Sequence, residues 1–326
     1  MKERELIQIG TKINDYTVLD HIGHGGFADV YRVISHKFMQ EFAAKVIHVP
    51  KDNLDKAWQS FNTEINALKM LDHPNIIRLY EHFLFQDHLV LILEYCPGGS
   101  LARVIEDNGP MDGDKLYSLA KQLVGALKYS HSQCIAHHDI KPQNILFDSF
   151  GRPKLADFGI SIQMPESNLC EDYHCSMAFA PPELINKVPH CPYKADVWSL
   201  GVLLAYACTG QIPFATMNAD ILKKAITTGS FILSICPAKE YLNLIQNCLR
   251  VDPKKRPSID MLSTNIDNKI PHQIQSINSL PTRIPSFGTS LTIPIFVPTK
   301  STHRRRSNSR SVIPQIHPFR GSILVK

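Results

Sequence analysis

The chain has 326 residues, with 35 basic and 30 acidic side chains and a formal net charge of +5. This length suits one two-lobed domain with an appendage better than a single small domain. No run of about 18 apolar residues predicts a transmembrane helix, and the charged start MKERELIQIG does not resemble a signal peptide. The eight cysteines are scattered without a CxxC pair, so we expect reduced thiols and a cytoplasmic protein.

The charge is distributed unevenly along the chain. From Asp267 onward there are nine Lys or Arg and one Asp, a net charge of +8, whereas residues 1–266 have a net charge of −3. The basic character therefore belongs to the C-terminal segment and not to the body of the protein.

The first third of the chain predicts mainly strands, after an N-terminal extension over residues 1–15. Over residues 16–49 apolar positions tend to alternate and glycines interrupt them, which is typical of antiparallel strands joined by turns. Two further strands are expected over residues 76–83 and 88–95. Between these strand regions, residues 55–71 have helical spacing, with one apolar face formed by Trp58, Phe61, Ile65 and Leu68.

Beyond Leu101 the pattern changes to helices. They are predicted over residues 115–131, 195–209, 219–228 and 241–249. After about Ile266 helical periodicity disappears. Residues 267–326 are rich in Pro, Ser, Thr and Arg, and we predict a basic, disordered tail there. Its apolar stretch at residues 291–298 is interpreted as unstructured, with docking in a groove as the alternative.

The most informative segment is HHDIKPQNILF at residues 137–147, followed by DFG at 157–159. It places two carboxylates and an amide, those of Asp139, Asp157 and Asn144, in one short region. Phosphoryl transfer needs a carboxylate beside the attacking hydroxyl and oxygen ligands for a metal ion that bridges the phosphates. These residues resemble the catalytic loop and the metal-binding motif of the eukaryotic protein kinases.

The resemblance covers residues 16–266 and implies an α+β, two-lobed protein kinase fold. Its small antiparallel-sheet N-lobe is expected over residues 16–95 and its larger helical C-lobe over residues 99–266, with the nucleotide between them. It also implies a serine/threonine protein kinase in intracellular signalling that uses ATP and Mg²⁺. The subgroup is loosely similar to calcium/calmodulin-dependent or autophagy-initiating kinases. A pseudokinase scaffold without turnover is the alternative, against which the retained catalytic residues argue.

The nucleotide site is expected around the Gly-rich segment IGHGGFADV at residues 22–30. Glycines allow backbone amides to approach phosphate oxygens, although a simple hairpin turn would also use them. Here Lys45 follows at the kinase spacing, while Ala28 replaces the family's third glycine. The nucleotide-binding residues that the resemblance implies are Ile22, Gly23, Gly25, Gly26, Val30, Ala43, Lys45, Glu64, Glu94, Cys96, Leu146 and Asp157.

By the resemblance, Lys45 pairs with the α and β phosphates and Glu64 orients it. A surface Lys and a surface Glu are the ordinary explanation of such a pair seen alone. The adenine is expected between apolar side chains and backbone hydrogen-bonding groups, with Leu93 guarding the back pocket. Above it would lie Val30 and Ala43, below it Leu146, and at its edge the backbone of Glu94 and Cys96.

In the catalytic loop the resemblance implies a role for each motif residue. Asp139 would accept or orient the hydroxyl proton of the protein substrate, and Lys141 would steady the transferring phosphoryl group. Asn144 and Asp157 would hold Mg²⁺. Each residue alone also fits a cap or a turn, but their order in one motif favours the catalytic interpretation.

The loop departs from the family at His138, where kinases usually have arginine. That arginine normally receives a phosphate from the activation loop through charge-assisted hydrogen bonds. A histidine is largely neutral at pH 7 and replaces it only weakly. We therefore hypothesise that activity does not depend strongly on activation-loop phosphorylation.

Other positions predict the structural support of the site and its substrate class. Ser176 is expected to contact the catalytic Asp and Lys, as in serine/threonine kinases. Glu183 is expected to pair with Arg256, and Asp196 to tether the catalytic-loop backbone. Gln143 replaces the glutamate with which many kinases bind basic substrates, so a strong preference for such substrates is not expected.

The remaining clusters predict little specific binding. Zinc is not expected in the region of Cys170, His174, Cys175, His190 and Cys191, because their spacing matches no standard site. The RRRSNSR segment at residues 304–310 is interpreted as a solvated tail. The alternatives are contact with an anionic surface, nuclear import, or phosphorylation of Ser307 and Ser309. Expected partners are protein substrates with Ser or Thr and no specific nucleic acid, and no oligomeric state is predicted.

Overall fold

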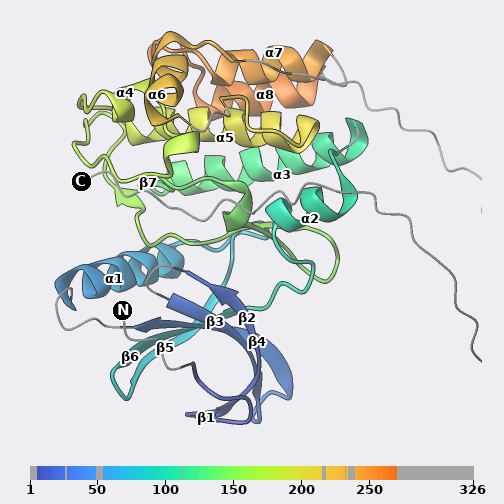
Figure 1. Cartoon of the computed structure of the whole chain (residues 1–326), viewed down its shortest axis with the longest axis vertical. Coiled ribbons are helices and arrows are strands. Elements are labelled where there is room, and N and C mark those ends of the chain that lie inside the picture. Colours follow the sequence, from blue (N-terminus) through green and yellow to red (C-terminus); the bar gives the residue numbers. More distant parts are fainter. Residues whose placement is uncertain are drawn as a thin grey trace, which may run out of the picture. The chain divides into compact units, whose positions relative to one another are not determined.

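The computed structural model describes residues 6–25, 28–48, 54–111, 113–214, 218–231, 233 and 239–269. A sheet with one helix comes first in the chain, and a mainly helical region follows (Figure 1). The predicted α+β architecture is therefore confirmed. The part of the predicted tail that follows Lys269 lies outside the described residues. Within them, no helix has both the length and the hydropathy that crossing a membrane requires.

The sheet has six antiparallel strands in the order β1-β2-β3-β4-β6-β5. They are β1 (Lys12–Ile13), β2 (Tyr16–His24), β3 (Ala28–Ser35), β4 (Gln40–His48), β5 (Leu79–Phe85) and β6 (His88–Glu94). The strand expected over residues 76–83 begins at Leu79, because Ile76 and Ile77 pair instead with Leu155 of a later strand.

The side chains of the central strands alternate between two cores, as the period of two in a strand requires. On β4 and β6 one set packs toward the helix and the helical region: Ala43, Ile47, Leu89, Leu91 and Leu93. The other set forms a separate core on the opposite face: Phe42, Ala44, Val46, Val90 and Ile92. The sheet therefore has an inner face that meets the rest of the domain and an outer face with its own small core.

Helix α1 (Leu54–Met70) lies beside the sheet and packs against β4 and β5 (Figure 1). Its predicted apolar face is largely confirmed, since Phe61, Ile65 and Leu68 are buried. Trp58 is the exception and is 40% exposed. Its ring meets the edge of Phe61, at 5.9 Å between centroids, so it shields this end of the core while its other side faces solvent.

The helical region contains the four predicted helices with small shifts at their ends. They are α3 (Gly113–Ser132), α5 (Pro192–Thr209), α6 (Ala219–Thr228) and α7 (Lys239–Cys248). Nearly every residue of α5 is buried, which explains why its sequence is apolar all round. Three helices were not predicted: α2 (Leu101–Asn108), α4 (Pro182–Ile185) and α8 (Ile259–Lys269). Helix α8 extends three residues beyond the predicted end of the domain at residue 266.

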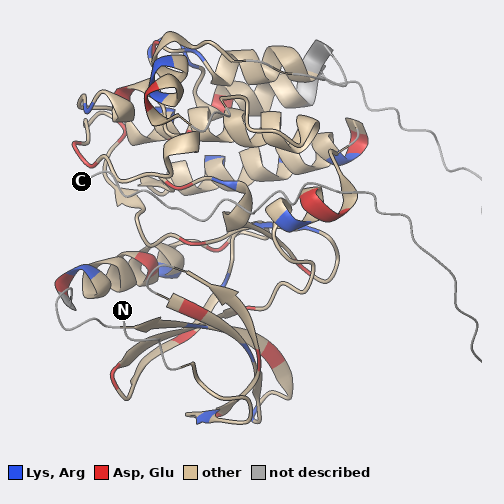
Figure 2. Cartoon of the chain, viewed as in Figure 1, with Lys and Arg blue, Asp and Glu red and all other residues tan. Residues whose placement is uncertain are grey.

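Two short strand pairs flank the loops that contain the HHDIKPQN and DFG motifs. β7 (Ile135–Ala136) pairs with β10 (Ile162–Gln163), and β8 (Ile145–Phe147) pairs with β9 (Pro153–Leu155). Residues 137–144 therefore lie between β7 and β8, and the DFG segment lies between β9 and β10. In the described part of the chain, basic and acidic residues are interspersed over both the sheet and the helices (Figure 2).

Candidate active site

The two motif loops are held side by side by backbone hydrogen bonds. β8 and β9 are antiparallel, and the amide of Ala156 donates to the carbonyl of Asn144 at 2.8 Å. This contact brings Asn144 close to Asp157, the next residue after Ala156. The two predicted Mg²⁺ ligands, 13 positions apart in the sequence, are thus neighbours because a hairpin joins them.

Lys45 connects three elements of the domain. Its Nζ donates to Glu64 Oε2 of α1 at 2.6 Å and to Asp157 Oδ1 of the DFG segment at 2.8 Å. The positive charge of Lys45 lowers the pKa of Asp157 to about 2. Burial raises the pKa of Glu64, whose side chain is only 1% exposed. One ammonium group therefore compensates two carboxylates, and the pair predicted from the sequence is formed.

A second contact ties α1 to the DFG segment. Ser60 Oγ donates to the carbonyl of Gly159 at 3.0 Å. A Cβ atom at Gly159 would lie 2.7 Å from that hydroxyl oxygen, so the Ser60 side chain would have to move to admit one. Phe158, which precedes Gly159 in the chain, is fully buried, and its ring meets His137 edge-on, at 4.5 Å between centroids. Sequence reasoning missed Ser60, because a hydroxyl 99 positions away from its partner gives no local signal.

The catalytic loop contains a connected set of hydrogen bonds around Asp139. Lys141 Nζ donates to Asp139 Oδ2 at 2.6 Å and to Ser176 Oγ at 3.2 Å. Ser176 Oγ in turn donates to Asp139 Oδ1 at 2.8 Å. Asn144 Nδ2 donates to the Asp139 carbonyl at 2.8 Å. The predicted contacts of Ser176 are confirmed, and the Asp139 carboxylate is held in one orientation.

Asp196 of α5 binds the backbone at the start of this loop, as predicted. Its carboxylate accepts the backbone amides of His137 and His138, both at 2.8 Å, and the ring of His131 at 2.8 Å. The side chain of Asp196 is fully buried. His138 has φ +67°, a left-handed conformation that costs a side chain free energy. The hydrogen bonds to Asp196 stabilise this turn.

The ring of His138 is buried and stacks on His190, with 5.5 Å between centroids and 3.2 Å between the two Nε2 atoms. Burial lowers the pKa of His138 to about 4. The imidazole is therefore neutral near pH 7, and only one of two nitrogens this close together carries a proton between them. A neutral, stacked ring offers no cation to a phosphate on the activation segment.

Glu183 and Arg256 form the predicted ion pair inside the helical region. Arg256 donates through Nη1 to Glu183 Oε1 at 2.7 Å and through Nη2 to Oε2 at 3.1 Å. Its guanidinium also donates to the carbonyls of Arg250 and Lys194, and its side chain is 0% exposed. A charge buried this completely requires these acceptors.

The predicted nucleotide-binding residues border the inner face of the sheet. Ala43, Val30 and Leu146 belong to or pack on the same apolar core, whereas Ile22 is 44% exposed. Gly26 lies outside the described residues. At Gly23 a Cβ atom would already touch Val30 at 3.4 Å, so the strand pair is close there.

The hinge between the sheet and the helical region has an ion pair that the sequence did not reveal. Lys154 of β9 contacts Glu94 at 2.6 Å, and both side chains are at least four-fifths buried. Burial raises the pKa of the nearby Cys96 thiol to about 12, so this cysteine stays protonated and unreactive. The backbone amide of Glu94 donates to the carbonyl of Arg78 at 2.9 Å.

The cysteines and histidines of the activation segment are placed by backbone pairing. Cys170 and His190 exchange two backbone hydrogen bonds, at 2.7 and 3.0 Å, and the His190 ring stacks on His138. None of the seven cysteines in the described part of the chain forms a disulfide. The expectation that this region binds no zinc remains a prediction.

Comparison with known proteins agrees with the motifs. The family model of the protein kinase domain matches residues 16–265. The chain is 36% identical over 252 residues to the maternal embryonic leucine zipper kinase of Xenopus tropicalis, which covers 76% of this chain and 38% of that relative. It is 34% identical over 245 residues to the sperm motility kinase 2A of Mus musculus, covering 75% and 48% of the two lengths. The matches thus span half or less of these relatives.

Proposed function

Because this chain belongs to the eukaryotic serine/threonine protein kinase family, we propose that it transfers the γ-phosphate of ATP to serine or threonine hydroxyls of protein substrates. The proposed reaction joins the substrate hydroxyl oxygen to the γ-phosphorus and breaks the bond between that phosphorus and the β–γ bridging oxygen. The hydroxyl proton goes to Asp139, and ADP leaves. We further propose a role in intracellular signalling in the cytoplasm.

The donor groups at the candidate site fit a magnesium–nucleotide complex. Asn144 and Asp157 offer an amide and a carboxylate, which are the hard oxygen ligands that Mg²⁺ prefers. A Mg²⁺ ion held by them would neutralise charge on the phosphates. Lys45, already aligned by Glu64 at 2.6 Å, supplies the positive charge for the α and β phosphates.

The hydrogen bonds of Asp139 support its proposed role as the base. Its Oδ1 accepts from Ser176 and its Oδ2 from Lys141, so the carboxylate is oriented before any substrate binds. A carboxylate oxygen has further lone-pair capacity for an incoming hydroxyl. Lys141, beside it, stabilises negative charge that develops on the transferred group.

One observation carries the proposal of turnover over the pseudokinase alternative. Lys45 contacts Glu64 and Asp157 at the same time, at 2.6 and 2.8 Å. Kinase activity requires both the Lys–Glu pair and the DFG aspartate to be in place. A scaffold that only binds partners has no need to keep this arrangement together with the Asp139 base.

The test is transfer of labelled γ-phosphate to a generic protein substrate, with Asp139→Asn as the variant. Loss of the carboxylate is expected to lower turnover by about 10²–10⁴-fold with little change in melting temperature. Asp107→Asn is the matched control, because that carboxylate pairs with Arg103 on an exposed surface. Phosphoamino-acid analysis checks the Ser/Thr preference. Wild-type protein that binds ATP without any turnover would support the scaffold alternative.

Two further proposals concern the choice of substrate and the role of the tail. Gln143, on the short 3₁₀ helix Pro142–Asn144, has no charge with which to select arginine, so we propose substrates without a strict basic motif. The basic tail, outside the described residues, is proposed to contact an anionic surface or a docking partner.

A further inference from the structure

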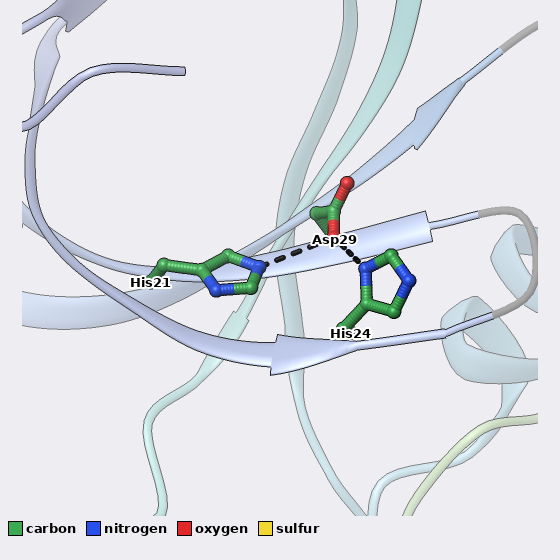
Figure 3. Close-up of side chains that lie close together, drawn as sticks. All are labelled: His21, His24 and Asp29. Atoms are coloured by element: carbon green, nitrogen blue, oxygen red, sulfur yellow. Dashed lines mark hydrogen bonds and ion pairs between the residues drawn. The ribbon is translucent and has the colours of Figure 1, made fainter. Parts of the chain in front are cut away.

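A fully buried carboxylate lies among histidines on the sheet, at the edge of the Gly-rich loop. Asp29 of β3 is 0% exposed. Its Oδ1 lies 2.6 Å from His24 Nδ1 and 3.1 Å from His21 Nε2, both from β2 (Figure 3). Its Oδ2 lies 2.5 Å from His48 Nε2 of β4. Burying a carboxylate is costly, so these imidazoles are its main compensation.

A bulge in β2 creates this cluster. Residues three apart in a regular strand point to opposite faces. The register shifts between His21 and Gly23, so that His21 stands opposite Tyr31 and His24 opposite Asp29. The extra residue turns both histidines to one side of the strand pair. His48 reaches the same carboxylate as a diagonal neighbour, since Asp29 stands opposite Val46.

The cluster lies on the outer face of the sheet. Tyr31 and Val33 follow Asp29 at intervals of two on β3, and Val46 precedes His48 at the same interval on β4. All three apolar residues belong to the outer core. Lys45, of the opposite parity on β4, points to α1 and the DFG segment. The side chains of the histidine cluster therefore lie on the opposite face of the sheet from Lys45, although His24 and Asp29 belong to the Gly-rich segment 22–30.

We propose that His21, His24 and Asp29 bind a divalent transition metal ion of the zinc class. Their ligand atoms all lie within 4.8 Å of one another. A tetrahedral zinc site with bonds of about 2.0–2.1 Å separates its ligand atoms by roughly 3.3 Å. On binding, the 2.6 Å contact of His24 Nδ1 with Asp29 Oδ1 would therefore lengthen, and any separation near the 4.8 Å limit would shorten. Two imidazoles with one carboxylate suit zinc, copper or nickel, whereas calcium and magnesium prefer oxygen ligands throughout.

The surroundings fit such a site. His48 donates to the second oxygen of Asp29 and would orient the carboxylate, as groups around metal ligands commonly do. The His48 ring is itself supported by His88, edge-on at 4.9 Å between centroids. The side chains of His24 and His21 are 62% and 33% exposed, so an ion reaches them directly from solvent and water completes its coordination.

The competing explanation is a hydrogen-bonded cluster that never binds metal. In it, His21, His24 and His48 each donate one N–H to Asp29, and the carboxylate is satisfied without an ion. A metal needs the lone pairs of the same His21 and His24 nitrogens, so it replaces the N–H donors there and breaks their hydrogen bonds to Asp29. Binding of a metal ion, and not stability alone, therefore separates the two explanations.

The experiment uses the full chain, first treated with a chelator, and Co²⁺ as a spectroscopic probe for zinc. We expect one tetrahedral Co²⁺ site whose spectrum lacks sulfur-to-cobalt charge transfer, which distinguishes it from sites at the cysteines. Zn²⁺ should displace the cobalt. The double variant His21→Gln/His24→Gln should bind Zn²⁺ at least about tenfold more weakly. His82→Gln, an exposed histidine on β5 outside the cluster, is the control and should bind normally.

A second readout does not depend on the spectrum or on kinase activity. Zinc should slow hydrogen exchange of the backbone amides over residues 21–25, because it would link β2 to β3 at the edge of the Gly-rich loop. Asp29→Asn, checked by thermal melting to be folded, should abolish this effect. Unchanged zinc affinity in the double histidine variant, a thiolate-type cobalt spectrum, or no zinc binding by the wild type would each overturn the proposal.

Discussion

The neutral pair of His138 and His190 separates this catalytic loop from the usual kinase pattern. Where arginine would present a cation, a buried imidazole stacks at 5.5 Å on a second one. Treatment with a phosphatase is therefore expected to leave kinase activity within about twofold of the untreated level, because no charge-assisted contact is lost. The assay compares treated and untreated protein with the same substrate. A collapse to background would contradict the hypothesis.

His138 also predicts how stability changes with pH. Its pKa is about 4 in the folded protein, against an ordinary value of 6.5. Between these values the unfolded chain binds a proton that the folded chain does not, so lowering the pH from 6.5 to 4 favours unfolding. Denaturant titrations at several pH values should show this loss of the free energy of unfolding.

In His138→Gln the loss over this window should be smaller than in the wild type. The exposed His36, on the turn after β3, provides the control, and His36→Gln should follow the wild-type curve. An identical pH dependence in His138→Gln and wild type would show that other groups, such as His190, govern the effect.

At the scale of elements, the helical region depends on close packing of α5 against α7. A Cβ atom at Gly201 of α5 would lie 2.5 Å from Cys248 Cβ of α7. Gly201→Ala is expected to lower the free energy of unfolding by about 1–3 kcal/mol, because a packed core tolerates added volume poorly. The measurement is chemical denaturation followed by circular dichroism.

A second glycine supplies the matched control. At Gly125 in α3 nothing lies within 4 Å of the added Cβ atom. Gly125→Ala should therefore stabilise the protein by up to about 1 kcal/mol, through the better helix propensity of alanine. Equal changes in the free energy of unfolding for the two substitutions would mean that helix propensity, and not packing, determines the stability effect at both sites.

At the scale of the whole molecule, the described domain has a complete core that closes with α8. Leu262 and Ile266 of that helix are buried, and α8 packs on α3. Removal of residues 271–326 is thus expected to leave the melting temperature and the kinase activity unchanged. Calorimetry and the phosphate-transfer assay on both proteins check this. A lower melting temperature would place part of the domain's stability in the tail.

The sequence by itself determined the family and predicted the class of reaction and the candidate site residues. This was possible because the motifs are short and chemically specific: a carboxylate at Asp139, oxygen ligands at Asn144 and Asp157, and a cation at Lys45. Sequence patterns also identified four of the seven helices described after the sheet, namely α3, α5, α6 and α7. None of these inferences needed to know which distant residues meet.

Only the tertiary structure decided the contacts between distant segments and the faces of irregular strands. Ser60 meets Gly159 and Lys154 meets Glu94 across 99 and 60 positions, and chain folding alone makes such pairs neighbours. Trp58 has the periodicity of a core residue, yet it is 40% exposed. The bulge at His21–Gly23 reverses the alternation on which strand faces are predicted. That shift brings His21 and His24 to Asp29, and regular strand alternation would not have predicted this cluster.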